Sequence, residues 1–303
     1  MLCNIFMFHY EYKLFFINMR EKLKRFFLEK YNFLNVLSRK RWFSKKFDRF
    51  IDEVLALRAE NYVDYLFSKI RFISSEEYAN MLYDFSEFFL SEYSEKDTLL
   101  CATAAQSDKD SSQEVLYDIT VNIAALSNKK YETCNRYDKA SGVIKELANK
   151  GQIIKRVLLV DEFFGSGVTA SGRIKSLKQH LVDKKICVDE VSFFVIASHV
   201  NSYKLIKNNV DVKFYYTYEI LDNVISSIDD DHERDVYYYL NYIWCRLFSE
   251  SFKDFKLPDL GYGDCEVSYY RENGSCPNNV LPIVWWPNLH DETWREPIFP
   301  RYI

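Results

Sequence analysis

Glycine and proline are scarce in this chain, which has eight glycines and six prolines among 303 residues. Residues 1–97 contain neither, and every proline lies within residues 258–300. This scarcity excludes a fibrous or linker-rich protein, and a content of 48% hydrophobic and 17% aromatic residues excludes a disordered one. The chain is long enough to bury one large core or two smaller ones.

Long apolar runs without charge are missing as well, so the sequence predicts no transmembrane helix and no membrane partner. Residues 1–18 are apolar and aromatic, but they include Glu11 and Lys13 and lack a small-residue cleavage site, which argues against a signal peptide. Met19 begins a more ordinary amphipathic run, and the sequence leaves open whether translation starts at Met1 or at Met19.

Paired metal-binding motifs are the third absence. The seven cysteines show no CxxC spacing, and the five histidines form no HxxxH pair. An odd number of scattered cysteines predicts reduced thiols in a cytoplasmic protein and argues against a disulfide framework. The same scatter argues against a zinc site.

Positive charge is concentrated near the N-terminus. The formal net charge of the chain is −4, yet residues 1–50 hold twelve Lys and Arg against four Asp and Glu. Basic residues interleaved with aromatic ones can grip single-stranded nucleic acid by charge and stacking, whereas a solvated helix face has a similar pattern, and the sequence leaves both readings open. The residues concerned surround Trp42 and Phe43 and are Arg39, Lys40, Arg41, Lys45, Lys46 and Arg49.

The pattern of apolar residues divides the chain into three parts. We predict a helical N-terminal region over residues 1–97, an α/β core over 98–225, and a long helix (about 232–250) with a proline-rich extension over 226–303. In the core, expected strands at 99–104, 156–160, 191–197 and 212–217 alternate with expected helices at 114–126, 139–149, 169–182 and 200–208. Strands separated by helices of this length predict a mainly parallel sheet flanked by helices.

The most informative segment runs from Asp161 to Gly172, directly after the clearest strand and before a helix. Gly165 and Gly167 allow a tight turn that presents backbone N–H groups, and Ser166 and Thr169 add hydroxyl donors. The N-terminal end of the following helix adds positive potential, so this segment suits the binding of one phosphate group.

Two acids, Asp161 and Glu162, precede this turn at the carboxyl end of the strand, where ligands of open α/β sheets bind. Carboxylates are good acceptors for sugar hydroxyls, so a ribose with its 5-phosphate on the turn places its 2- and 3-hydroxyls against the two acids. A divalent metal held by the sugar and a pyrophosphate offsets their charge.

A hydrophobic strand, two acids, two apolar residues and then Gly-Ser-Gly-x-Thr resembles the phosphoribosyl pyrophosphate motif of type I phosphoribosyltransferases. The resemblance implies that Asp161 and Glu162 are the catalytic pair that holds the ribose hydroxyls, with Mg²⁺ as cofactor and no direct protein ligand to the metal. It assigns the 5-phosphate to Gly165, Ser166, Gly167, Val168 and Thr169. It also places a pyrophosphate-binding loop at residues 105–112, with Lys109, Ser111 and Ser112 as candidate donors.

A narrower resemblance covers more of the chain. The Phe163-Phe-Gly-Ser-Gly167 form of the turn, together with Cys276-Pro-Asn-Asn-Val-Leu-Pro-Ile-Val-Trp285, is similar to phosphoribosyltransferase-like proteins with a C-terminal extension. That family is associated with bacterial conflict systems, including retron cassettes. The resemblance implies an effector of antiviral defence that acts on phosphoribosyl pyrophosphate or a nucleotide. Its implied partners are a reverse transcriptase and the RNA–DNA product, bound through the basic N-terminal region.

Two other functions fit parts of the sequence. A non-catalytic module that binds nucleic acid or a polymerase would share the same fold, and Asp161→Asn would then leave complex formation intact. The Asp161-to-Thr169 segment also resembles the S-adenosylmethionine loop of DNA methyltransferases. Glu162 replaces the proline of that loop, however, and no Asn/Asp-Pro-Pro-Tyr segment is present to grip an extruded base.

Overall fold

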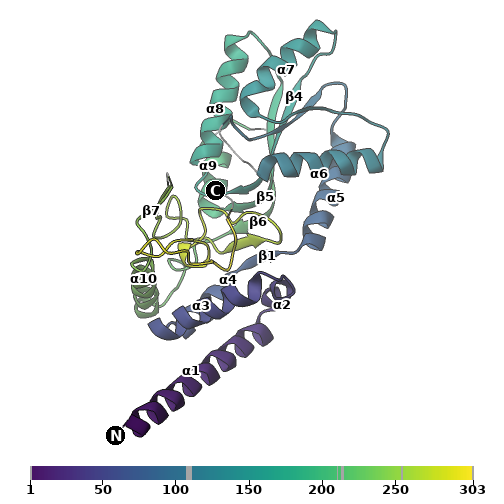
Figure 1. Cartoon of the computed structure of the whole chain (residues 1–303). Coiled ribbons are helices and arrows are strands. Elements are labelled where there is room, and N and C mark those ends of the chain that lie inside the picture. The colour runs from purple at the N-terminus through teal and green to yellow at the C-terminus, as the bar shows by residue number, and fades with distance from the viewer. Residues whose placement is uncertain (1, 107–110, 210, 213–214, 254, 302–303) are drawn as a thin grey trace. The chain divides into compact units, whose positions relative to one another are not determined.

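The computed structural model describes residues 2–106, 111–209, 211–212, 215–253 and 255–301 (Figure 1). The chain forms two compact units, each built from segments that are separated in the sequence. The first, which we call the helical unit, comprises residues 1–74, 224–261 and 268–303. The second, the α/β unit, comprises residues 75–223 and 262–267.

A five-stranded sheet with every neighbouring pair parallel forms the centre of the α/β unit, in the order β3-β2-β4-β5-β6. The strands are β2 (Thr98–Ala102), β3 (Glu132–Cys134), β4 (Arg156–Phe164), β5 (Glu190–His199) and β6 (Tyr215–Leu221). Buried apolar residues fill both faces of the central strands, as expected of a sheet covered on both sides. The predicted fold class, a mainly parallel sheet flanked by helices, is confirmed.

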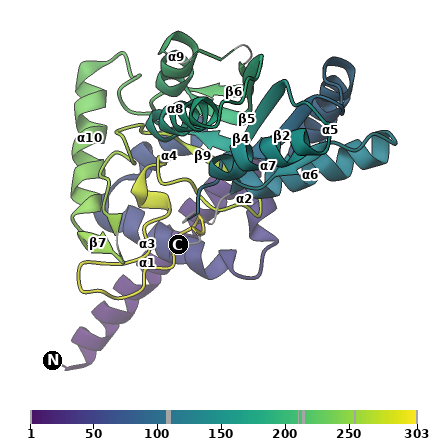
Figure 2. The same cartoon turned by 90° about the horizontal axis from the view of Figure 1, so that it is seen from above.

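Helices cover both faces of this sheet (Figures 1 and 2). They are α5 (Ser75–Glu92), α6 (Ser111–Leu126), α7 (Tyr137–Asn149), α8 (Val168–Asp183) and α9 (Val200–Asn209). One apolar cluster joins α7, α8 and α9 to β4 and β5 through residues such as Ile144, Ile174 and Ile206. On the other face, Phe85 of α5 stacks on Phe194 of β5 with ring centroids 3.7 Å apart.

Three details of the sheet differ from the sequence expectations. β4 continues through Asp161 to Phe164, because Asp161 and Phe163 keep their register with Val195 and Ala197 of β5. β6 begins at Tyr215, later than the strand expected at 212–217, part of which lies outside the described residues. The edge strand β3 was not predicted, since three residues carry too short a pattern to be recognised.

The helical unit combines the first 74 residues with most of the last 80. Its helices are α1 (Leu2–Lys30), α2 (Asn32–Ser38), α3 (Phe43–Leu57), α4 (Glu60–Lys69) and α10 (Asp231–Cys245). The strand β1 (Arg71–Ile73) pairs in parallel with β9 (Tyr269–Arg271) of the extension. The remaining short elements are β7 (Ser251–Phe252), β8 (Phe255–Lys256) and the 3-10 helix η1 (Pro282–Val284).

A buried guanidinium fixes the extension to α3. Arg295, which is 4% exposed, donates to both carboxylate oxygens of Glu53 at 2.7–3.0 Å and to the carbonyl oxygens of Ile283 and Trp286. Glu53 also accepts a 2.8 Å hydrogen bond from the indole N–H of Trp244 in α10. One carboxylate therefore joins α3, α10 and the extension.

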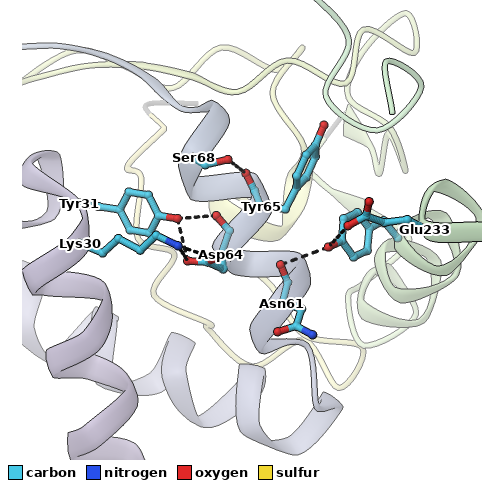
Figure 3. Close-up of polar contacts among 8 residues, drawn as sticks. Lys30, Tyr31, Asn61, Asp64, Tyr65, Ser68 and Glu233 are labelled. Atoms are coloured by element: carbon cyan, nitrogen blue, oxygen red, sulfur yellow. Dashed lines mark hydrogen bonds and ion pairs between the residues drawn. The ribbon is translucent and has the colours of Figure 1, made fainter. Parts of the chain in front are cut away.

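Polar contacts along α4 connect it to two other helices of the same unit (Figure 3). The Asp64 carboxylate accepts from Lys30 Nζ at 2.6 Å and from the Tyr31 hydroxyl at 2.7 Å, both near the end of α1. On α10, Tyr237 donates to Glu233 at 2.8 Å and is within 3.5 Å of the Asn61 carbonyl oxygen. The start of α10 is capped by the Asp230 side chain, which accepts from the Glu233 N–H at 2.8 Å.

Among the described residues, no helix combines the length and the hydropathy needed to cross a membrane.

Candidate functional site

The candidate site lies where β4 ends and α8 begins, at the carboxyl edge of the parallel sheet. Asp161 and Glu162 belong to the end of β4, Gly165 to Gly167 form the turn, and α8 begins at Val168. The structure therefore places all seven predicted residues of this segment on one strand–turn–helix unit. Because α8 begins directly after the turn, its N-terminal end lies beside it. The first N–H groups of a helix have no intrahelical acceptor, so those of α8 can contribute to the binding of an anion.

Gly167 allows the turn to close tightly. Its φ of +77° is in the left-handed region, and a Cβ at this position would lie 2.9 Å from the Cα and 2.7 Å from the Oγ of Ser202 on α9. The Gly167 carbonyl accepts from the Ser171 N–H at 2.8 Å, so the helical pattern begins at once. Only glycine satisfies both the dihedral angle and the approach of α9.

Hydroxyl groups of the turn have different surroundings. Ser166 is half-buried and its Oγ lies 3.5 Å from the N–H of Val168, whereas Thr169 is exposed on the first turn of α8. Both are short, uncharged donors beside backbone N–H groups, which is the chemistry that a phosphate oxygen requires. The turn can therefore offer several neutral donors to one anion.

Asp161 is held by groups from the neighbouring strand and from its own backbone. The Thr103 hydroxyl, immediately after β2, donates to one carboxylate oxygen, and the N–H of Glu162 donates to the other at 2.7 Å. Arg173 of α8 lies 3.5 Å from the Thr103 hydroxyl through Nη1. Thr103 and Arg173 are thus additional residues of the site, which sequence reasoning missed.

Strand register and helix spacing together identify Thr103 and Arg173. Ala102 pairs with Val160, so the next residue on each strand, Thr103 and Asp161, lie side by side at the sheet edge. Arg173 follows Thr169 by four residues, which places both on one face of α8. Finding them requires the strand register, which the sequence alone does not give.

Both acids lie deep in the fold. Asp161 is 7% exposed and Glu162 is 2% exposed. A buried carboxylate needs hydrogen bonds or an opposite charge around its oxygens. A ribose that binds Asp161 and Glu162 must therefore replace some of their present contacts with its own hydroxyl donors. The geometry consequently favours a ligand with several hydroxyl donors over one that offers a single polar contact.

The loop predicted to bind pyrophosphate is described only at its ends. Ser112, which is fully buried, accepts from the N–H of Ala104 at 3.1 Å and so fixes the chain after β2 to the start of α6. Ser111 is the first residue of α6 and is partly exposed. Lys109 lies outside the described residues. Ser112 thus has an observed structural contact, and its role as a pyrophosphate donor stays a prediction.

A resident metal site would need a cluster of ligating side chains. Within the residues that the structure describes, no three His, Cys, Asp or Glu side chains are grouped so that they could hold a metal ion. Mg²⁺ commonly takes one or two carboxylates and completes its shell with water and substrate phosphates. Asp161 and Glu162 fit that role only as a supplement to oxygen ligands that a substrate brings.

The basic N-terminal segment is extensively engaged within the helical unit. Phe43 is fully buried, and Lys46 lies 4.9 Å from the ring centroid of Trp42. Ion pairs among the described residues of this region include Arg20–Asp52, Lys24–Asp48, Lys30–Asp64, Lys40–Glu272, Lys45–Glu296 and Arg49–Glu296. Much of the excess positive charge is therefore matched by acids of the same unit.

A protein-family match extends over nearly the whole chain and agrees with the resemblance to phosphoribosyltransferase-like proteins. A family model described as PRTase-CE matches residues 23–301 of the chain. A search of curated proteins found no match. Among solved structures, the chain is similar to a hypothetical protein from Neisseria gonorrhoeae with bound ppGpp, at 14% identity and a TM-score of 0.32, over 55% of this chain and 95% of that one.

Proposed function

Since the chain belongs to the PRTase-CE family of phosphoribosyltransferase-like proteins with an extension, we propose that it binds phosphoribosyl pyrophosphate, or a nucleotide, at the end of β4 and transfers or cleaves the ribosyl group. One observation supports this proposal most directly. Two consecutive acids end a buried parallel strand immediately before a Gly-Ser-Gly turn at the N-terminus of a helix.

Each residue has a distinct task in this proposal. The N–H groups of the turn and the hydroxyls of Ser166 and Thr169 hold the 5-phosphate, while Asp161 and Glu162 accept from the ribose hydroxyls. In the reaction, the bond between C1 of the ribose and the pyrophosphate oxygen breaks, and pyrophosphate leaves with the electron pair. A nitrogen of an acceptor base in transfer, or water in cleavage, then bonds to C1 and releases a proton to solvent. The chain contributes chiefly by holding the two ends of the ribose in fixed positions.

Magnesium belongs to the proposal as a partner of the substrate. When bound, it neutralises the charge of the departing pyrophosphate. Asp161 and Glu162 would accept from the sugar hydroxyls whose oxygens, with those of the pyrophosphate, would hold the metal. Arg173 is a cation of the described structure near this edge, and we propose that it adds positive potential beside Asp161 by way of Thr103.

The proposed biological role is that of an effector in a bacterial antiviral system of the retron type that the resemblance names. Its support is the Phe-Phe-Gly-Ser-Gly turn together with the distant Pro-Asn-Asn segment. The role predicts that a strain carrying the protein with its neighbouring genes resists phage, and that Asp161→Asn removes the resistance. Resistance unchanged by Asp161→Asn would contradict an enzymatic effector.

The alternative, a non-catalytic module that docks a reverse transcriptase with its RNA–DNA product, depended on the basic N-terminal segment. The ion pairs of that segment reduce the charge available for a polyanion. Surface pairs are weak and exchange readily, so docking is tested separately, by co-purification at low and at high salt.

Calorimetric titration with phosphoribosyl pyrophosphate and Mg²⁺ tests the ligand. We expect saturable binding by the wild type, and at least a tenfold loss, about 1.4 kcal/mol, in Asp161→Asn and in Glu162→Gln. Glu146→Gln, on the exposed surface of α7, is the control for a change of charge and should bind as the wild type.

S-Adenosylmethionine serves as the competing ligand in the same titration. Heat from S-adenosylmethionine and none from phosphoribosyl pyrophosphate would replace the proposed function with that of a methyltransferase. Equal binding of phosphoribosyl pyrophosphate by the wild type and both acid variants would overturn the assignment of the acids.

A further inference from the structure

Six residues of the C-terminal extension, Tyr262–Val267, belong to the α/β unit rather than to the helical unit that contains the residues on either side of them. We call this segment the strap. Three of its residues have positive φ: Gly263 at 71°, Asp264 at 50° and Glu266 at 48°. Left-handed conformations are unfavourable for residues other than glycine, so the contacts of the strap must maintain its shape.

The strap packs directly on the phosphate-binding turn. A Cβ on Gly263 would lie 2.7 Å from the Cβ of Ser166 and 3.3 Å from its hydroxyl oxygen. Real Cβ atoms do not approach this closely, so only glycine allows the strap backbone to cover Ser166. The strap therefore limits the positions that the Ser166 side chain can adopt.

Asn223, just after β6, holds the strap in place. Its Nδ2 group donates to the carbonyl oxygens of Cys265 at 3.3 Å and of Asp264 at 3.4 Å. Its Oδ1 lies 3.2 Å from Nε2 of His199, which is the last residue of β5. One side-chain amide thus connects the ends of two sheet strands to the strap.

His199 orients this amide. Its Nδ1 accepts from the N–H of Asn201 at 3.3 Å, so the ring proton of the neutral form lies on Nε2 and is donated to Asn223. Burial lowers the pKa of His199, although Asn223, Asp222 and Glu266 oppose the shift. The neutral ring therefore predominates at neutral pH, and the Asn223 amide keeps its nitrogen toward the strap.

We propose that Asn223 and Gly263 are positioning residues for the phosphate-binding turn and act through the strap. On this view the extension completes the site: the strap fixes Ser166 from one side, while Ser202 lies against Gly167 from the other. The choice of 5-phosphate as the ligand rests on the proposed function, whereas the restraint of the turn by the strap does not.

Asn223→Asp tests this proposal without removing the side chain. The aspartate keeps an oxygen that accepts from His199, but its second oxygen replaces the N–H donor and repels the carbonyl oxygens of Asp264 and Cys265. Gly172→Ala is the control, because a Cβ there has nothing within 4 Å and alanine is favoured within a helix.

Two measurements are made on each full-length protein. The first is hydrogen exchange of the ligand-free protein over residues 163–169, which we expect to be about tenfold faster in Asn223→Asp and unchanged in Gly172→Ala. The second is the affinity for ribose 5-phosphate and for ribose. We expect Asn223→Asp to weaken ribose 5-phosphate about tenfold and to leave any binding of ribose unaltered.

The outcomes separate the strap from the proposed function. Unchanged exchange over residues 163–169 in Asn223→Asp would overturn the proposal, as would an equal loss of affinity for ribose and ribose 5-phosphate. Faster exchange without any ribose 5-phosphate binding in the wild type would support the restraint of the turn and count against the proposed ligand. Gly263→Ala is a second variant, because its Cβ would clash with Ser166, and it should also make hydrogen exchange over residues 163–169 faster.

Discussion

Each of the two units holds a carboxylate at a junction of its elements: Glu53 is partly buried, Asp161 is buried, and the partners described for the two differ. In the helical unit, Glu53 meets the guanidinium of Arg295 and the indole of Trp244. In the α/β unit, Asp161 accepts from a neutral hydroxyl and from the next backbone N–H. We therefore expect Glu53 to stabilise the junction of three elements, whereas Asp161, at a strand end beside a Gly-Ser-Gly turn, is the candidate for contact with a ligand.

The units can be observed separately. All five tryptophans belong to the helical unit, so tryptophan fluorescence follows its unfolding alone. Far-ultraviolet circular dichroism follows both units. Substitutions in each unit can therefore show how much that unit's own contacts contribute to its free energy of unfolding.

The largest effect is expected from Arg295→Ala. Removing the guanidinium takes the ion-pair partner from Glu53, to which Trp244 still donates, and takes one donor from each of two carbonyl oxygens. This should lower the free energy of unfolding by about 3 kcal/mol. Denaturant titration followed by tryptophan fluorescence measures the loss. The affinity of the α/β unit for phosphoribosyl pyrophosphate should change far less than the free energy of unfolding. A loss of affinity as large as the loss of stability would show that the two units unfold together.

Gly167→Ala is the corresponding change in the α/β unit. The left-handed angle and the contact with Ser202 should together cost about 2 kcal/mol or displace the turn. We expect the circular dichroism transition to move while the tryptophan transition stays in place. Gly172→Ala, with open space around its Cβ, should be neutral or slightly stabilising.

Paired thiols of the α/β unit give a pH-dependent test. Cys101 and Cys134 are opposite each other on β2 and β3, and a hydrogen bond from Cys101 lowers the pKa of Cys134 to about 7. In the helical unit, burial raises the pKa of Cys245. Thiolate absorbance should therefore appear between about pH 6 and pH 8 and should vanish in Cys134→Ser.

The same shift affects stability in a defined direction. Because the folded pKa of Cys134 is below its unfolded value, its contribution is present above about pH 8.5 and is lost as the pH falls through about 7. The wild type should gain about 1–2 kcal/mol over Cys134→Ser between these pH values. A constant difference across this range would contradict the shift.

The smallest effect is expected at the start of α10. Asp230→Ala removes the acceptor for the Glu233 N–H and should cost about 1 kcal/mol in the tryptophan transition, since Trp244 lies in this helix. Asp229→Ala, one residue earlier, is the control and should cost a few tenths of that amount at most. Equal effects would indicate a general charge effect at the helix start instead of a cap.

The α/β unit could be predicted because its elements follow one another in the sequence. β4, α8, β5 and α9 are consecutive, and apolar periodicity with short connections identifies each one. The pairing of residues 1–74 with the extension could not be predicted, since about 150 residues separate the segments and aromatic helices carry no mark of their partners.

The same division applies to the candidate site. Asp161 to Thr169 are contiguous, so their chemistry is visible as a motif. Thr103 depends on the register of β2 against β4, and Asn223 depends on how β6 ends beside β5. Gly263 lies about a hundred residues from Ser166 and has no side chain to suggest a role, so only the folded chain shows its contact.

The interleaving of the two units also has a consequence for synthesis of the chain. The first helices leave the ribosome long before Arg295, Trp285 and Phe299, which complete the core that they share. At about 5–20 residues per second, a delay on the order of ten seconds or more separates the two segments. During that interval, apolar faces of α1 to α4 lack their final cover, and nascent-chain chaperones are the natural means of shielding them.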